Sequence, residues 1–130
     1  MTIPLYCIGV AFFLIYLPRL LVIRAQLQRP EGLDNINPRE QQKLLDPAGL
    51  RANAAHQNAF ESFAPFAAAV ILSHIAHANP GLSAAAALTH VASRTIYPFV
   101  YVAGFGALRT AVWALGFLAT AALFVLAYSA

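Results

Sequence analysis

The sequence predicts an all-α integral membrane protein, built as a bundle of four transmembrane helices. Of its 130 residues, 60% are hydrophobic and only 10% are charged, and the mean hydropathy is +0.65. Soluble domains are about 45–50% apolar and about 25% charged. The apolar residues gather in four stretches, each close to the length of about 20 residues that a spanning helix needs. Length and composition therefore indicate a single membrane domain.

Recognisable turns separate the four expected spans. The spans cover residues 3–23, 52–77, 82–103 and 108–127. No basic residue precedes Arg19, so we expect the first span to be a retained helix and not a signal peptide. Asn79-Pro80-Gly81 and Gly104-Phe105-Gly106 are the expected tight turns between the later spans.

The long connection between the first two spans runs from Arg24 to about Leu50 and is polar. Within it, Asn37 is a candidate N-cap, Pro38 occupies the first helical position, and Glu40 occupies the third. This arrangement predicts a short surface helix that begins at Pro38 and ends near Leu45.

The basic residues indicate an orientation in the membrane. All eight lie in or beside the long connection, or flank the joint between the third and fourth spans. The positive-inside rule then puts the long connection in the cytoplasm and both termini outside it. The net charge of +3 is thus a topology signal, and it gives no support to nucleic-acid binding.

The second span begins with polar residues, which a membrane helix would be expected to avoid. At about 100° per residue, Arg51 and Asn58 share one face, and Glu61 lies about 60° from Asn58. His56 points nearly the opposite way, toward another neighbour. One face therefore presents a cation, an amide and a carboxylate.

The third and fourth spans carry similar polar faces. Arg94, Tyr97 and Tyr101 follow each other at helical spacing on the third span, and Arg109 shares a face with Trp113 on the fourth. Thr110 lies beside Arg109. Pro98, within the third span, is expected to kink that helix.

Two interpretations of these groups remain open on chemical grounds. Glu61 could form an ion pair with Arg94 or Arg51 that holds two helices together, while Asn58 hydrogen-bonds to the backbone of a neighbouring helix. Alternatively, the groups bind a ligand, since ionisable residues inside membranes are costly and often functional. Arginines with an amide suit carboxylates, a glutamate suits an ammonium, and a cationic site favours a thiolate. Glutathione carries all these groups, although this chemistry alone does not select it.

Two motifs make the chain resemble a known family. Arg51-x-x-x-Ala55-His56-x-Asn58-x-x-Glu61, followed by Pro65-Phe66, resembles the second-helix signature of the MAPEG family, the membrane-associated proteins in eicosanoid and glutathione metabolism. The third-helix run Arg94-x-x-Tyr97-x-x-x-Tyr101 and the later Leu108-Arg109-Thr110-x-x-Trp113 resemble the corresponding family segments. The resemblance covers nearly the whole chain.

The resemblance implies a homotrimer with glutathione, as co-substrate, bound between subunits near the cytoplasmic side. It implies a glutathione transferase or peroxidase that acts on lipophilic electrophiles in a bacterial inner membrane. Arg109 would be the catalytic residue that stabilises the thiolate, and Trp113 could shield it. The glutathione contacts implied by position are Arg51, Asn58, Glu61, Arg94, Tyr97, Tyr101 and Thr110. We expect no metal among the site residues.

The chain departs from the family pattern at two of these positions. Ala54 stands where the signature has a second arginine, so one cation for a glutathione carboxylate is missing. Tyr97 stands where some relatives have a histidine.

Three other functions are compatible with the sequence. A non-catalytic, lipid-binding trimer could use the same fold, because a fold does not determine a function. His74, His77 and His90 could form a metal site, although we expect them on the outer side, away from the arginines. A channel or transporter is disfavoured because the chain has no inverted repeat and no pair of broken helices.

Overall fold

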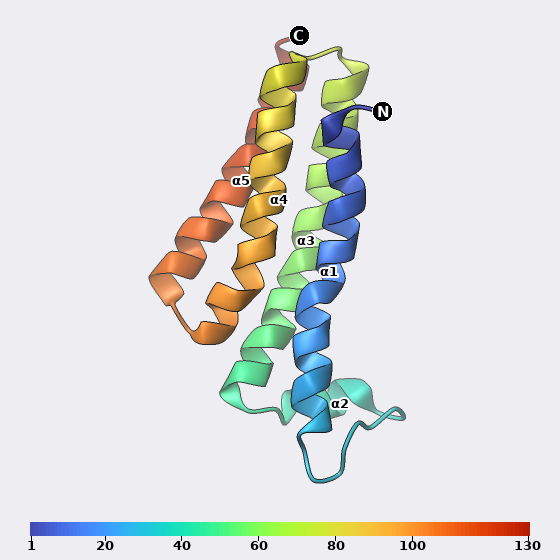
Figure 1. Ribbon diagram of the computed structural model, residues 1–130, viewed down its shortest axis with the longest axis vertical. Helices are drawn as coiled ribbons and strands as arrows, with labels where there is room; N and C mark the ends of the chain where they lie inside the picture. The colour runs from blue at the N-terminus through green and yellow to red at the C-terminus, as the bar shows by residue number, and fades with distance from the viewer.

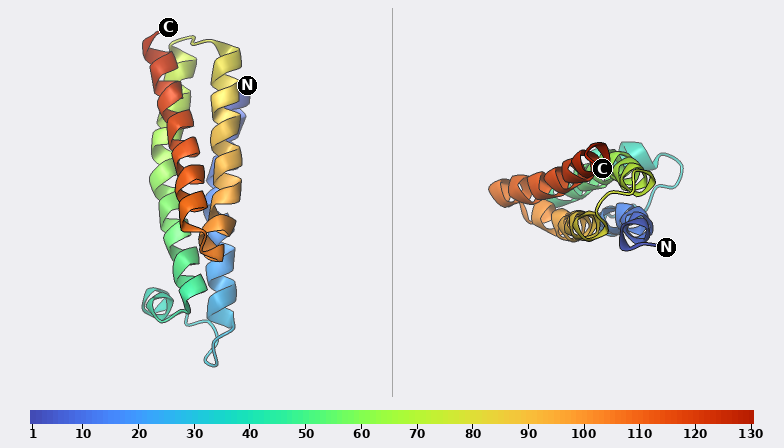
Figure 2. Two further views of the ribbon diagram at one scale, coloured as in Figure 1. Left: turned by 90° about the vertical axis from the view of Figure 1, so that its left-hand side faces the viewer. Right: turned by 90° about the horizontal axis from the view of Figure 1, so that it is seen from above.

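The computed structural model describes residues 1–130 and contains four long helices and a short one (Figure 1). They are α1 (Ile3–Leu27), α2 (Pro38–Lys43), α3 (Pro47–Ile75), α4 (Pro80–Ala103) and α5 (Gly106–Tyr128). The long helices run side by side, with both termini at one end of the bundle and α2 at the other (Figures 1 and 2). The all-helical class and the four main helices agree with the prediction. By length and composition, α1 and α5 are each apolar enough to cross a membrane.

The second long helix, α3, begins earlier than the predicted span at residue 52. Asp46 is its N-cap, and the Oδ1 atom of Asp46 accepts a hydrogen bond from the Gly49 backbone N–H at 2.8 Å. The sequence analysis missed this cap, so Arg51 lies inside the helix instead of at its edge. At the other end α3 stops at Ile75, because His77 takes the left-handed conformation with φ of 55°.

The predicted surface helix exists, but it ends at Lys43 instead of near Leu45. Asn37 is at the N-cap position, yet its side chain makes no capping hydrogen bond. Asp34 organises the approach to the helix instead, because its Oδ1 atom accepts from the backbone N–H groups of Ile36 at 2.8 Å and Asn37 at 2.9 Å.

A buried pair of glutamines attaches α2 to the bundle. The Nε2 atom of Gln26, at the end of α1, donates to Oε1 of Gln41 at 2.9 Å. Gly49 allows α3 to approach α1 closely, since a Cβ there would lie 3.1 Å from that of Ala25. In the loop, a hydrogen bond from Arg29 lowers the pKa of the exposed Glu31.

The predicted turn at Gly104 is confirmed, whereas Pro80 and Gly81 already belong to α4, so the chain turns between Ile75 and Asn79 instead of at Asn79-Pro80-Gly81. Asn79 caps α4, with its Oδ1 accepting from the backbone N–H groups of Gly81 and Leu82, both at 3.0 Å. Gly104 ends α4 in the left-handed conformation, with φ of 83°, which glycine adopts without a Cβ clash.

The apolar core lies in the half of the bundle nearer the termini. It combines small residues, such as Ala69 and Ala87, with Phe66, Val70 and Leu123, so that the helices approach closely. Toward the other end, the α4–α5 joint leans away from α1 and α3 (Figures 1 and 2).

Candidate functional site

Three predicted residues form a hydrogen-bonded chain between α3 and α4. The Nη1 atom of Arg94 donates to Oδ1 of Asn58 at 3.0 Å. The Nδ2 atom of Asn58 in turn donates to Oε2 of Glu61 at 3.1 Å. The amide of Asn58 therefore orients the cation and the carboxylate toward the same region of the molecule.

Arg94 is buried without a counter-ion. Only 8% of its surface is exposed, and its Nε atom has no hydrogen-bond partner. Neither of the two ion pairs in the chain includes it. A buried charge is normally paired and fully hydrogen-bonded, so this guanidinium has capacity for another acceptor.

Gly116 on α5 makes room for this guanidinium. A Cβ at Gly116 would lie 3.0 Å from Nη2 of Arg94 and 2.7 Å from Oγ of Ser93, which are closer approaches than real Cβ atoms normally make. The sequence analysis did not single out Gly116. A glycine inside a strong helical pattern is the signal that could have found it.

A groove of about 430 Å³ opens beside Arg94, between α3 and α5. Its polar part includes Asn58, Glu61 and Arg94, and its apolar part includes Phe117 and Phe124. Small-molecule sites commonly have volumes of about 300–1,000 Å³ and combine an apolar lining with a few polar groups. The groove has the dimensions and the chemistry of such a site.

A second group of predicted residues lies at the α4–α5 joint. The guanidinium of Arg109 lies over the ring of Tyr101, 4.8 Å from its centroid. Arg51 reaches the same joint, where its Nε donates to the Val102 carbonyl at 3.0 Å. The rings of Tyr97 and Tyr101 pack edge to face at 5.6 Å and connect this group to Arg94.

Two further predicted residues occupy α5. The hydroxyl of Thr110 donates to the Gly106 carbonyl of its own helix at 3.1 Å. Trp113 stacks on Phe117 with 5.3 Å between ring centroids, and both rings line the groove. Arg109 and Thr110 do not line the groove within this single chain.

The interpretation in which Glu61 pairs with Arg94 or Arg51 to hold two helices together is wrong. Glu61 forms no ion pair with Arg94 or Arg51, because the Asn58 amide lies between Glu61 and Arg94 and Arg51 is bonded to Val102. Glu61 is also exposed, so a polar partner outside the chain can reach its carboxylate.

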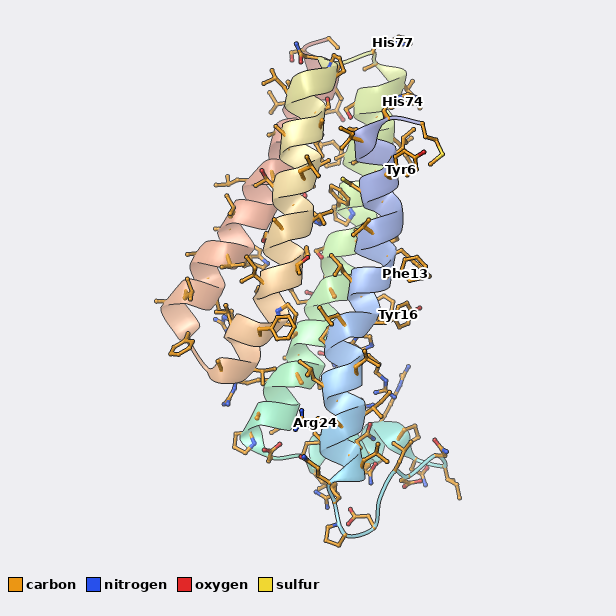
Figure 3. The ribbon with its side chains drawn as sticks, in the orientation of Figure 1. Tyr6, Phe13, Tyr16, Arg24, His74 and His77 are labelled. Atoms are coloured by element: carbon orange, nitrogen blue, oxygen red, sulfur yellow. The ribbon has the colours of Figure 1, made fainter.

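The metal interpretation placed His90 on the outer side of the bundle with His74 and His77. His90 instead lies inside the bundle on α4, where it is 1% exposed and stacks on Phe66 with 3.8 Å between ring centroids. Its Nδ1 atom lies 3.1 Å from the Gly116 carbonyl, which can only accept, so Nδ1 carries a proton. No three histidine, cysteine or acidic side chains gather as metal ligands. His74 and His77 lie at the end near the termini (Figure 3).

His90 instead belongs to the stripe of α4 that contains Arg94, Tyr97 and Tyr101. It lines the groove, together with Thr120 of α5, whose hydroxyl lies 2.9 Å from Nδ1 of His90. The spacing of residues 90, 94, 97 and 101 on one helical face was the signal that could have found it.

His56 faces away from the groove, as predicted. Its Nδ1 atom donates to the Ile15 carbonyl of α1 at 2.9 Å, whereas Asn58 contacts α4. The two sides of α3 therefore have different neighbours.

Prolines sit one turn after two of the site residues. Pro65 in α3 and Pro98 in α4 have no N–H, so they leave the carbonyls of Glu61 and Arg94 without their usual helical donors. Both helices continue through the prolines, and the predicted kink at Pro98 stays a prediction.

The bundle and its buried arginine define a class, the helical membrane proteins with an ionisable site between their helices. The chain belongs to the MAPEG family, which it matches over residues 3–129. This is a family of four-helix membrane proteins, and membership implies a glutathione-related membrane enzyme or binding protein. No curated protein and no solved structure matches the chain.

Proposed function

We propose that the protein is a glutathione-dependent transferase or peroxidase acting on lipophilic electrophiles. Glutathione binds between the subunits of a homotrimer, near the cytoplasmic side of the membrane. The observation that carries the proposal is the buried guanidinium of Arg94, which has an unpartnered Nε atom and opens onto a groove.

Each polar group of the site matches a group of glutathione. Arg94 is suited to a carboxylate, because a guanidinium binds carboxylates through charge-assisted hydrogen bonds. Glu61 is exposed beside it and bonded only to Asn58, so it is suited to the ligand's ammonium group. The apolar end of the groove, at Phe117 and Phe124, suits a lipophilic electrophile.

In this proposal Arg109 stabilises the thiolate of bound glutathione. It stands in the first turn of α5, where a helix N-terminus also favours negative charge. A thiol with an ordinary pKa of about 8.5 is mostly protonated at neutral pH. Lowering that pKa by about two units would make most of the bound thiol nucleophilic, and corresponds to about 2.7 kcal/mol.

In this proposal the homotrimer explains why the residues around Arg94 and those around Arg109 form two separate groups within one chain. Arg109 lies over Tyr101 and not in the groove beside Arg94. A ligand held between subunits can contact the Arg94 group and the joint at the same time, or one group from each of two chains.

Stopped-flow ultraviolet absorbance of the purified protein mixed with glutathione tests the proposal. We expect an absorbance rise from the bound thiolate, followed by turnover of a model electrophile. S-methylglutathione is the matched control, since it keeps the carboxylates and the amine but has no ionisable thiol. Absence of both the thiolate signal and turnover at saturating glutathione would exclude the enzyme.

A non-catalytic binding protein of the same fold is the second candidate. Ala54 replaces the arginine of the family signature, and the Thr110 hydroxyl is bonded within its own helix. Glutathione or lipid binding in calorimetry, without thiolate formation or turnover, would support this candidate.

A further inference from the structure

A second hollow lies on the side of α3 opposite the groove. It has a volume of about 600 Å³ and is lined by residues of α1, α2 and α3. His56 lines it and bonds to α1, whereas Asn58 faces α4, so α3 separates this hollow from the Arg94 site. We name it the basic hollow, and its charged lining residues are Arg19, Arg39 and Lys43.

The basic hollow is cationic. Arg19 comes from α1, and Arg39 and Lys43 come from α2. None of the five carboxylate side chains of the protein lines it, and only Lys43 has an ionic partner, Glu40, at 2.8 Å. The guanidinium groups of Arg19 and Arg39 make no hydrogen bond or ion pair within the chain. Two free cations therefore face a common space.

The position of the hollow along the bundle matches the level of phospholipid headgroups. Arg19 lies about 24 Å along α1 from Ile3, at about 1.5 Å per residue. The hydrocarbon core of a bilayer is about 30 Å thick, and arginines near a helix end extend to the interface. α2 lies across this end of the bundle (Figure 1), and its residues Pro38, Arg39, Gln42 and Lys43 line the hollow.

An exposed aromatic surface leads from the hollow toward the membrane interior. Phe60 lines the hollow and packs edge to face on Tyr16, with 6.4 Å between centroids. Tyr16 packs on Phe12 in the same way at 5.6 Å, and Phe13 continues this surface. Tyr6, Phe13 and Tyr16 project from the same side of α1 (Figure 3). These rings are partly exposed, from 44% for Phe12 to 74% for Phe13.

We propose that the basic hollow binds an anionic phospholipid. Arg19 and Arg39 bind its phosphate, Lys43 and the amide of Asn53 complete the polar contacts, and an acyl chain lies over Phe60, Tyr16 and Phe12. The position at the headgroup level and the adjoining aromatic surface select a lipid over a soluble phosphate, because only a lipid uses both. Within the chain α3 separates this site from the Arg94 groove, and the inference does not depend on the proposed function.

Native mass spectrometry of the assembled protein, released from detergent with added lipid, tests this inference. We expect phosphatidylglycerol to be retained in preference to phosphatidylcholine. Basic residues near a membrane surface contribute about 1 kcal/mol each, which is about five-fold in affinity. Arg19→Gln and Arg39→Gln should each weaken phosphatidylglycerol binding by about that factor, and the double variant by more than either single variant. Retained helix content by circular dichroism confirms folding of these surface variants.

Arg24→Gln is the matched control, since Arg24 lies on the same helix as Arg19 and does not line the hollow. Its phosphatidylglycerol binding should equal that of the parent. Equal losses in the Arg24 and Arg19 variants would overturn the site in favour of general attraction to the basic surface. Displacement of the lipid by equimolar sodium phosphate or glutathione would also overturn it, as would an assembled protein that retains neither lipid.

Discussion

The guanidinium of Arg94 and the side-chain carbonyl of Asn58 lie 3.0 Å apart, although the two residues are 36 positions apart in the chain. Their hydrogen bond joins α4 to α3 at the floor of the groove. Because Asn58 also donates to Glu61, removing its amide disconnects a buried cation from the only carboxylate nearby.

Asn58→Ala is therefore expected to lower both stability and ligand affinity. Leaving a buried donor unpaired costs about 1–3 kcal/mol, and Arg94 already has one unpartnered nitrogen. Thermal unfolding in detergent and glutathione calorimetry measure the two effects. Asn35→Ala is the control, because Asn35 is exposed and its side chain makes no hydrogen bond in the chain. An Asn58 variant that behaves like the Asn35 variant would show that the hydrogen bonds of Asn58 to Arg94 and Glu61 have no energetic role.

Gly116→Ala is expected to destabilise the protein by about 1–3 kcal/mol, the usual cost of overpacking. The new methyl group would displace Ser93 or the guanidinium of Arg94, so glutathione affinity should fall with stability. Gly9→Ala on α1 is the matched control, since a Cβ there meets nothing within 4 Å. Equal unfolding temperatures for the two variants would mean that α5 does not hold Arg94 closely.

Glu61→Gln is expected to weaken glutathione binding about ten-fold while leaving the fold intact. Glu61 is exposed and has no ionic partner in the chain, so replacing its carboxylate leaves no buried cation without a counter-ion that it had before. A charge-assisted hydrogen bond contributes about 1.5–3 kcal/mol, and glutamine keeps only a neutral acceptor for the ligand's ammonium. Calorimetry at constant salt measures the change. An unchanged affinity would remove Glu61 from the site.

Arg109→Ala and Arg51→Ala are expected to have different effects. Without Arg109 the thiolate absorbance should disappear and turnover should fall, with a smaller change in glutathione affinity. Without Arg51 affinity should fall more than turnover, and the bond to Val102 at the joint is also lost. Stopped-flow absorbance and calorimetry on both variants separate these outcomes. Equal losses of affinity with the thiolate signal intact would contradict the assignment of separate roles.

The assembled protein is expected to be a homotrimer. Arg94 lacks a counter-ion, Glu61 is exposed, and the joint residues lie outside the groove, so one chain leaves the site incomplete. Native mass spectrometry from a mild detergent gives the number of subunits. A protein that is only monomeric, yet binds glutathione and turns over an electrophile, would contradict the intersubunit site.

The sequence by itself determined the class of the protein and the positions of its main elements. Hydrophobic runs of spanning length and strong local signals at Asn79-Pro80-Gly81 and Gly104 are properties of neighbouring residues, so they can be found without a fold. The motifs around Asn58, Glu61 and Arg94 likewise identified the family. Helical spacing also separated His56 from Asn58, because the direction of a side chain around a helix follows from its position in the sequence.

Only the tertiary structure decided which polar groups meet. The partner of Arg94 is Asn58 and not Glu61, and Arg51 turns to Val102, because distances between helices depend on how closely they pack. Gly116 matters only because α5 passes directly over Arg94. His90 joins the site because Phe66 and the Gly116 carbonyl surround it, and both belong to other helices. Spacing along one helix contains no information about such neighbours.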